Sequence, residues 1–336
     1  MKNIKYYICG NGLGHFHRAV SVCKILKSTY NYNVDACVIT SRPNISYHNK
    51  YFSFLEVINP SISELQLFSN HIIVSDNLIY PLWINRCSSN LLFHIGSFLW
   101  SKVFSVDPLF NQLDKCYMEN LFLENNVHSF INQYFYDPTL HAPLIRNLHL
   151  HGLTDLISCQ TKSDHSIQQD THCFAYISLG LSLFALSEAQ QVYNILASTI
   201  FSAYIFYFDK YLWENIKVNR SISWIKCRIN SHQYCLSNAR TLFIRPGLGT
   251  LNDILCRKIY SPLICCNFNN NKEIRSNIHA MRRLNYVTIE FNKHTTKNNI
   301  LDILTNSSKQ IPLQLLNYSG ITMIAQKINN LVANLG

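Results

Sequence analysis

Short apolar runs alternate along the chain with stretches in which apolar residues recur at helical spacing. In the first half, residues 4–9, 34–40 and 72–75 are apolar runs of strand length, and residues 18–27 carry an amphipathic helical pattern. The second half repeats this alternation, with strands expected at 174–178, 205–208, 241–244 and 263–266 and helices at 187–198, 251–257 and 319–335. Regular alternation of strands and helices is typical of an α/β protein with parallel sheets.

A polar stretch separates the two alternating halves. Residues 158–172 are rich in Ser, Asp and Gln and poor in apolar side chains, a composition that indicates a linker. A chain of 336 residues is long enough for two domains. We therefore predict an N-terminal domain at 1–160 and a C-terminal domain at 161–336, the latter including a closing helix near 320–335.

Composition limits the classes of binding partner and the cellular location that we expect, but it does not indicate the reaction. The 29 Lys and Arg against 19 Asp and Glu leave a net charge of +10, which favours anionic partners. The basic residues are dispersed rather than gathered in runs, so nucleic acid is not an expected partner. The 12 cysteines show no C-x-x-C pair, and the N-terminus shows no apolar stretch of signal-peptide length. These features predict a cytoplasmic protein with reduced thiols and leave open a peripheral contact with the cytoplasmic face of a membrane.

A glycine-rich loop follows the first predicted strand. It runs G-N-G-L-G-H from Gly10 to His15 and leads directly into a helix, whose N-terminal N–H groups and dipole attract anions. Gly12 and Gly14 allow a ligand to approach the backbone closely. The loop lacks the last glycine of G-x-G-x-x-G, and no acidic residue ends the second strand, so hydride transfer on NAD is disfavoured.

His15 is the chemically distinctive residue of this loop. A helix N-terminus disfavours the protonated imidazole, so a histidine at that place can accept a proton near neutral pH. The alternative interpretation is a histidine that only caps the helix. Spacing alone leaves both interpretations open.

A second glycine loop lies at the matching place in the C-terminal half. It runs R-P-G-L-G-T from Arg245 to Thr250, follows a predicted strand and opens a helix. Gly247, Gly249 and Thr250 can present N–H and O–H donors to a diphosphate. Asp253 lies one turn further on the same helix face, where its carboxylate can accept hydrogen bonds from a ribose diol. The alternative is a turn followed by an ordinary N-cap.

Five segments, in order along the chain, resemble GT-B fold glycosyltransferases. They are GNGLGHFHR, VSDNLIYPLWI, AYISLGLS, FIRPGLGTLNDIL and PLICCNFNNNKEIRSNIHAMRRLNYVTIEF. That family includes the bacterial peptidoglycan N-acetylglucosaminyltransferase and UDP-glycosyltransferase-like enzymes. The resemblance spans nearly the whole chain, and the ordered combination is more specific than any single segment.

The resemblance implies an α/β fold of the GT-B type, in which two Rossmann-like doubly wound domains face each other across a cleft. The N-terminal domain would bind the acceptor, and the C-terminal domain would bind a nucleotide-diphosphate sugar, usually UDP-linked. The protein would be a hexosyltransferase of glycoconjugate biosynthesis. The residues implied in donor binding are Gly180, Arg245, Gly247, Gly249 and Thr250 for the diphosphate and Asp253 for the ribose.

The same resemblance assigns the chemistry to the first loop. His15 matches the family's loop histidine, the base that deprotonates the acceptor hydroxyl for in-line, inverting displacement at the anomeric carbon. Asp76, at the end of a predicted strand, would orient or share that role, and a plain turn residue is the alternative. Gly12, Gly14 and Arg18 would form the loop that meets the acceptor or a phosphate. No D-x-D pair occurs in the sequence, so we expect neither a metal nor another cofactor.

One segment departs from the family pattern. The family's sugar-binding acid/amide–Gln pair corresponds here to Glu273-Ile274, so the glutamine is missing while Glu273 and Asn277 remain. The resemblance implies that Glu273 contacts sugar hydroxyls, and a solvated carboxylate at a helix start is the alternative. The identity of the sugar stays open.

The acceptor also stays open. Residues 91–110 are rich in aromatic and apolar side chains and could line an acceptor pocket or rest on a membrane; a partly buried helix of the N-terminal core is the alternative. Lipid-linked, glycan and small-molecule acceptors are all compatible with this segment. The nearest alternative function is a nucleotide-sugar hydrolase of the same fold, which has a similar G-x-G-H-x-x-R loop and uses water as the acceptor. A non-catalytic basic protein that binds nucleic acid or membranes is the more distant alternative.

Overall fold

The chain folds into two compact units, and each is described by itself. The computed structural model describes residues 2–10, 13–39, 55–58, 68–96, 99–103, 112–141, 145–154, 174–180, 184–198, 204–295, 297–306 and 315–334. The first unit consists of Met1–Cys159 and Leu316–Gly336, and the second unit consists of Gln160–Leu315.

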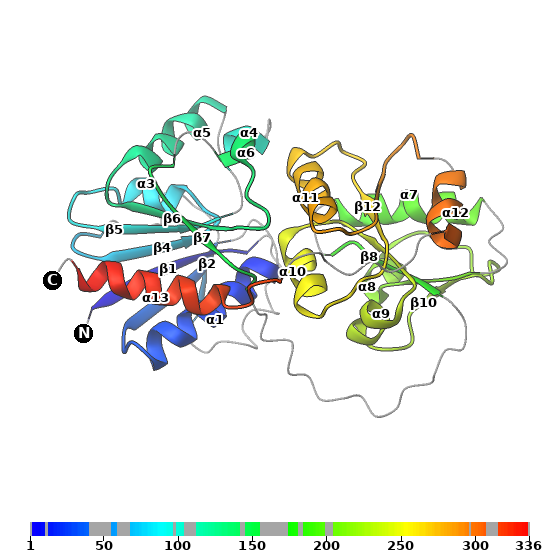
Figure 1. The fold of residues 1–336 in the computed structure, drawn as a ribbon, viewed down its shortest axis with the longest axis horizontal. Helices are drawn as coiled ribbons and strands as arrows, with labels where there is room; N and C mark the ends of the chain where they lie inside the picture. Colours follow the sequence, from blue (N-terminus) through cyan, green and yellow to red (C-terminus); the bar gives the residue numbers. More distant parts are fainter. Residues whose placement is uncertain are drawn as a thin grey trace. The chain divides into compact units, whose positions relative to one another are not determined.

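The first unit is built on a seven-stranded parallel sheet with the order β3-β2-β1-β4-β5-β6-β7 (Figure 1). The strands are β1 (Asn3–Cys9), β2 (Asn33–Ile39), β3 (Leu55–Ile58), β4 (Ile72–Asp76), β5 (Leu91–Ile95), β6 (Val127–Asn132) and β7 (Asn147–His151). This is a doubly wound, Rossmann-like order that reverses direction between β1 and β4. Such sheets bind ligands at the carboxyl ends of the strands beside the reversal.

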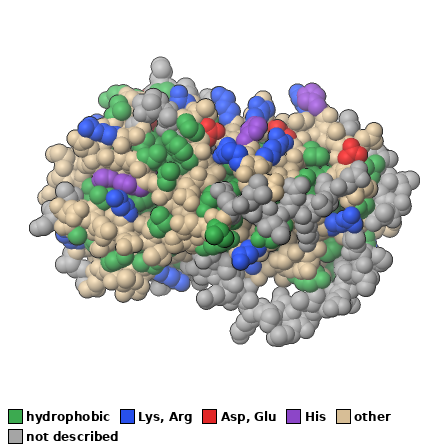
Figure 2. Space-filling model, in the orientation of Figure 1, with side chains coloured by type: hydrophobic (Ala, Val, Ile, Leu, Met, Phe, Trp, Pro, Cys, Tyr) green, Lys and Arg blue, Asp and Glu red, His purple; other side chains and the backbone are tan. Residues whose placement is uncertain are grey.

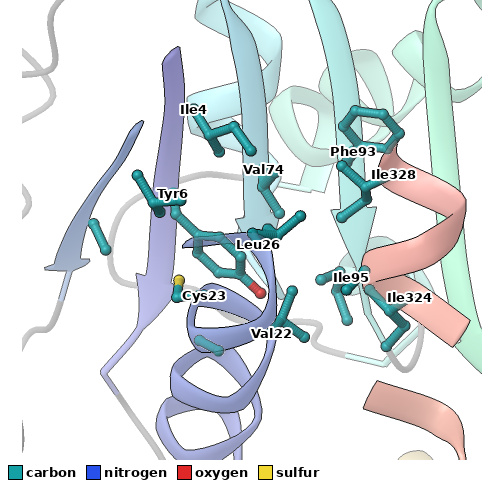
Figure 3. Packing of buried hydrophobic residues seen from close by; sticks show 14 of the residues in the cluster. Ile4, Tyr6, Val22, Cys23, Leu26, Val74, Phe93, Ile95, Ile324 and Ile328 are labelled. Atoms are coloured by element: carbon teal, nitrogen blue, oxygen red, sulfur yellow. The ribbon is translucent and has the colours of Figure 1, made fainter. Parts of the chain in front are cut away.

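Helices cover both faces of this sheet, because alternate strand residues point to opposite sides. On one face, α1 (Leu13–Ser28) and α13 (Gly320–Ala333) pack on apolar side chains of the central strands. Figure 3 shows this contact, with Tyr6 and Val74 of the sheet next to Leu26 of α1, and Phe93 next to Ile328 of α13.

The other face is covered mainly by α3 (Tyr80–Ile84), α5 (Gln112–Glu119) and the 3-10 helix η2 (Asn120–Leu123). The short helices α4 (Trp100–Val103) and α6 (Pro138–His141) also belong to this unit.

The closing helix belongs to the first unit, which corrects the prediction that placed it in the C-terminal domain. Its stripe of Ile321, Ile324 and Ile328 is buried against α1 and the first sheet. The chain is fixed just before the helix, where the N–H of Leu153 donates to the carbonyl of Asn317 at 2.7 Å. An apolar stripe predicts that a helix is buried but does not predict which sheet buries it.

Gly320 is required where the closing helix meets the first unit. A Cβ at Gly320 would lie 2.4 Å from the carbonyl oxygen of Gly152 and 2.6 Å from that of Leu153. These carbonyl oxygens belong to the backbone and cannot move away without distorting the segment that carries them. We therefore expect Gly320→Ala to destabilise the protein by about 1–3 kcal/mol. Urea unfolding of the full chain measures this loss. Gly247→Ala is the matched control because a Cβ there meets nothing within 4 Å; equal stability of the two variants would contradict the prediction.

The second unit is built on a six-stranded parallel sheet with the order β10-β9-β8-β11-β12-β13. The strands are β8 (Phe174–Ser178), β9 (Ile205–Phe208), β10 (Ile225–Cys227), β11 (Thr241–Ile244), β12 (Leu263–Cys266) and β13 (Thr288–Phe291). The helices are α7 (Ala185–Ala197), α8 (Lys210–Asn215), α9 (His232–Asn238), α10 (Leu248–Cys256), α11 (Lys272–Arg283) and α12 (Lys297–Asn306). The order reverses between β8 and β11, so the α/β, doubly wound architecture predicted for each half is confirmed.

Residues 91–110 do not form one continuous helix: they begin with a strand, the short helix α4 follows, and residues 97–98 and 104–110 lie outside the described residues. Their first five residues are the buried strand β5, which pairs with β4 and β6. A strand that is covered on both faces is apolar throughout, so its sequence resembles that of a buried helix. The predicted linker at 158–172 lies outside the described residues.

None of the helices in the described part of the chain combines the length and the apolar character needed to cross a bilayer. The cytoplasmic location and the peripheral membrane contact stay predictions.

Candidate active site

The first glycine loop places His15 at the carboxyl end of the first sheet. β1 ends at Cys9, where the N–H of Gly10 donates to the carbonyl of Ile39 at 2.7 Å, and α1 begins at Leu13. His15 therefore lies in the first turn of α1, and Arg18 lies one turn further. β4, the strand next to β1, ends at Asp76, which brings the carboxylate of Asp76 to the same edge.

His15, Asp76 and Arg18 form a hydrogen-bonded cluster. Nδ1 of His15 lies 2.9 Å from Oδ1 of Asp76. Arg18 binds the same carboxylate in a bidentate manner, from Nε to Oδ2 at 2.8 Å and from Nη2 to Oδ1 at 2.5 Å. Asp76 is fully buried and Arg18 nearly so, whereas the side chain of His15 is 23% exposed. Of the three residues, His15 is therefore the one that a substrate can reach.

The charge of Asp76 determines the tautomer of His15. Burial opposes the charged carboxylate, but the Arg18 guanidinium and the His15 hydrogen bond outweigh burial and hold the pKa of Asp76 below its usual value. An ionised carboxylate only accepts, and Nη2 of Arg18, which only donates, lies farther from Nδ1, at 3.2 Å. We therefore assign the proton of the imidazole to Nδ1. Nε2 is then an acceptor, and the side-chain amide nitrogen of Asn77 lies 3.5 Å from it. This is the arrangement in which a histidine can take a proton from a hydroxyl.

The second glycine loop ends at a helix N-terminus in the second unit. Gly247 is the N-cap of α10 in extended backbone and offers no side-chain cap, so the first-turn N–H groups remain for a ligand. Gly249 and Thr250 lie in that first turn and are partly exposed. Helix α10 starts three residues earlier than the sequence predicts, because Gly247 ends the extended segment directly before Leu248. The result is a local anion-binding geometry.

Two neighbouring helices hold this loop in place. Nη1 of Arg245 lies 3.2 Å from Oε1 of Glu188, which is buried in the first turn of α7, and the guanidinium lies over the ring of Phe184 at 5.5 Å. From α11, the amide of Asn277 donates to the carbonyl of Pro246 at 2.9 Å. The Arg245 charge is therefore fixed next to the helix N-terminus.

Two carboxyl groups of the second unit, those of Glu273 and Asp253, have raised pKa values. Burial raises the pKa of Glu273 to about 7, with Arg245 acting in the opposite direction. Burial likewise raises the pKa of Asp253 to about 6, opposed by Arg257. Oδ1 of Asp253 is buried and has no hydrogen-bond partner among the described residues, so it could accept a bond from a ligand.

The raised pKa of Glu273 predicts a pH-dependent stability difference. An acid whose pKa is higher in the folded state loses stability as pH rises from about 4.5 through about 7, because folding then has to bury the charge. We expect Glu273→Gln to melt at the same temperature as the wild type at pH 5 and at a higher temperature at pH 8. Thermal unfolding across pH 5–8 tests this, with Glu214→Gln as an exposed control on α8. A constant difference across that range would contradict the prediction.

Comparison with known proteins shows similarity only at the level of structure, since no family model and no curated protein matches the sequence. The spinosyn forosaminyltransferase SpnP matches with a TM-score of 0.59 and 11% identity over 99% of this chain and 95% of its own. The Arabidopsis thaliana protein UGT89C1, complexed with UDP, matches with a TM-score of 0.58 and 11% identity over 99% of each chain. A Listeria monocytogenes protein described as a UDP-N-acetylglucosamine 2-epimerase matches with a TM-score of 0.58 and 10% identity, over 97% of this chain and 94% of its own.

The chain has the GT-B fold. Identities near 10% show the fold alone, and this GT-B fold occurs in transferases and in a protein described as an epimerase. The reaction therefore has to be argued from the site residues.

Within the GT-B units, the structure gives two of the predicted site residues a buried protein partner. Arg18, assigned to the loop that meets the acceptor or a phosphate, is buried against Asp76 and cannot offer its guanidinium to a ligand. Asn277, assigned to the donor, is also buried and holds the backbone of the second loop. Gly12 lies outside the described residues, whereas Gly14 lies in the first turn of α1.

Gly180 lies two residues after β8 and has a φ of 70°, a left-handed conformation that favours glycine. Its role toward a diphosphate stays a prediction, as do those of Gly247, Gly249 and Thr250.

Sequence analysis missed Glu188 as a site residue. Glu188 is 1% exposed, and its carboxylate is paired with Arg245 of the second glycine loop. The one local signal was an acidic residue shortly after the loop that follows β8. Its partner Arg245 is 57 positions away, so the pair becomes evident only in the fold.

No group of three or more His, Cys, Asp or Glu within the described residues is placed to hold a metal ion. The expectation of metal-independent chemistry therefore stays a prediction.

Proposed function

We propose that this protein is a glycosyltransferase that moves a sugar from a nucleotide-diphosphate sugar, UDP-linked, to an acceptor hydroxyl. The single observation that carries the proposal is the His15–Asp76 pair, in which Nδ1 of a partly exposed His15 is bound to a buried carboxylate. The GT-B fold and the UDP complex of one structural relative support the choice of donor.

In the proposed reaction, Nε2 of His15 takes the proton of the acceptor hydroxyl as its oxygen attacks the anomeric carbon. The bond between the anomeric carbon and the diphosphate oxygen breaks, and the nucleoside diphosphate leaves with the electron pair. Attack in line with the leaving group inverts the anomeric centre. Asp76 stabilises the imidazolium that forms, and the N-terminus of α10 with Arg245 stabilises the charge on the leaving diphosphate.

The three carboxyl groups of the second unit have separate proposed roles. Asp253, with its unpartnered Oδ1, would accept hydrogen bonds from the ribose. Glu273 would contact sugar hydroxyls, and Glu188 would hold Arg245 in position. The sugar and the acceptor are not assigned.

Nucleotide binding is the first test. A ligand that binds only the folded state raises the melting temperature, so UDP, GDP, dTDP and CMP are compared by thermal shift. We expect a shift with UDP, and a shift with none of the four would contradict the proposal. Turnover of UDP-sugars is then measured with and without acceptors. Rapid release of free sugar without an acceptor would favour the nucleotide-sugar hydrolase.

Asp253→Ala should weaken UDP binding. Loss of a charged hydrogen-bond acceptor to the ribose costs about 1.5–3 kcal/mol, which corresponds to a tenfold or greater rise in the Kd for UDP. Isothermal titration calorimetry measures this change. Asp302→Ala, an exposed aspartate on α12, is the control. If both variants bind UDP like the wild type, Asp253 has no part in the donor site.

A further inference from the structure

Helix α11, which packs along the edge strand β13 of the second unit, has a uniformly basic exposed side. Its exposed residues all carry a guanidinium, ammonium or imidazole group, and they are Lys272, Arg275, His279, Arg282 and Arg283. No exposed residue of α11 is apolar or acidic. Figure 2 shows Lys, Arg and His side chains gathered where Figure 1 places this helix. We call these five residues the basic face.

The packing of α11 fixes the direction of the basic face. Its members follow one another at intervals of three or four positions, which places them on one side of a helix. The opposite side carries Ile274, Ile278 and Met281, all buried in the second unit. The helix therefore cannot turn the basic face inward. From Lys272 to Arg283 this face is about 16 Å long, since an α-helix rises about 1.5 Å per residue.

The positive charge of the basic face is largely unneutralised. Among the described residues its only ion pair joins Arg275 to Glu290, with Nη2 lying 4.0 Å from Oε1. Arg282 donates instead to the hydroxyl and carbonyl oxygens of Thr288, which are neutral. Glu273, the one acidic residue of α11, is partly buried. Cations that outnumber the carboxylates next to them attract an anionic partner.

The character of the basic face favours a lipid surface over a protein or a single-stranded nucleic acid. The centre of a protein interface is poor in charged residues and rich in aromatic ones, and the bases of a single strand stack on aromatic side chains. The basic face offers neither an aromatic nor an aliphatic residue. Four Lys and Arg on one side of an amphipathic helix are instead typical of contact with anionic phospholipids.

We propose that the basic face of α11 docks on a bilayer that contains anionic phospholipids. The helix would lie parallel to the bilayer, with its Lys and Arg side chains against the phosphate and carboxylate groups of the lipids. No exposed apolar side chain is present on α11 to enter the hydrocarbon region, so the contact is electrostatic and weakens as salt screens the charges. This docking surface is independent of the proposed transferase function.

Cosedimentation of the full chain with vesicles tests the proposal. One set of vesicles contains equimolar phosphatidylcholine and phosphatidylserine, and the other contains phosphatidylcholine alone. We expect binding to the first set at low salt, release at high salt and no binding to the second set. Each Lys or Arg at an anionic surface contributes about fivefold, so Lys272→Gln/Arg283→Gln should weaken the binding about 25-fold. Equal binding to both sets, or equal binding of the variant and the wild type, would overturn the proposal.

A second double variant separates the basic face from the net charge of the chain. Arg220→Gln/Lys226→Gln also removes one exposed Arg and one exposed Lys, but from the turn before β10 and from β10 itself, the opposite edge of the second sheet. It should bind the vesicles like the wild type. If the two double variants lose binding equally, net charge and not the basic face drives the contact, and the proposal fails.

A duplex oligonucleotide is the competing polyanion. We expect it to bind more weakly than the vesicles that contain phosphatidylserine. Tighter binding of the duplex, with the same loss in Lys272→Gln/Arg283→Gln, would assign the basic face to nucleic acid and overturn the lipid proposal. The exposed positions of both double variants predict unchanged thermal unfolding, which is measured alongside. Vesicle binding by a protein that does not bind UDP would count against the transferase function and not against this docking surface.

Discussion

His15→Ala should lower turnover roughly 10²–10⁴-fold while leaving UDP binding intact. A positioned general base contributes roughly this factor to the rate, and His15 is hydrogen-bonded to the buried carboxylate of Asp76. UDP affinity should stay the same because the proposed donor residues belong to the second unit. Single-turnover kinetics with a UDP-sugar, together with UDP calorimetry, measures the two effects separately.

His71→Ala is the matched control for this experiment. His71 directly precedes β4, the strand that carries Asp76 at its other end, so the change tests a histidine of the same unit away from the candidate base. Its turnover should equal that of the wild type. Turnover of His15→Ala within a few-fold of the wild type would remove His15 from the mechanism.

Arg18→Leu should have the largest effect on stability. The substitution leaves the fully buried carboxylate of Asp76 without its bidentate partner. Removing one member of a buried ion pair costs about 3–5 kcal/mol, because the remaining charge stays in a poorly solvated place. The loss should be largest at neutral pH and smaller in acid, where Asp76 can take up a proton. Urea unfolding at pH 7 and pH 5 measures it.

The double variant Arg18→Leu/Asp76→Leu, compared with Arg18→Leu and Asp76→Leu alone, separates ion pairing from packing. Replacing both charges by apolar groups avoids the unpaired charge, so most of the lost stability should return. Turnover should not return, because His15 then lacks the carboxylate that orients it. Lys24→Gln, on the exposed side of α1, controls for loss of a positive charge. If the double variant loses as much stability as the two single variants together, Arg18 and Asp76 do not act as a pair.

The candidate site was partly predictable because its two loops are local in sequence. A strand, a glycine-rich turn and a helix follow one another within about a dozen residues at each loop, so His15, Gly247 and Thr250 could be placed at helix starts without tertiary information. Asp76 could be placed only at the end of a strand. Its contact with His15 depends on β4 pairing with β1, which is a matter of strand order.

Other parts of the site depend on contacts between distant residues. Arg18 was assigned to a ligand because its distance in sequence from Asp76, 58 positions, conceals their pairing. Glu188 was overlooked for the same reason, and Asn277 was assigned to the donor although it holds the backbone of Pro246. A polar side chain next to a glycine loop has the same appearance in sequence whether it faces a ligand or a buried partner.

The sequence by itself determined the alternation of strands and helices that is typical of an α/β protein and the positions of both glycine loops. These features depend on periodicity and backbone freedom, which are properties of neighbouring residues. Only the tertiary structure decided that the closing helix packs on the first sheet and that Arg18 serves Asp76 rather than a ligand. The physical reason is that apolar burial is non-directional, while buried charges need a partner that only strand order and helix packing can supply.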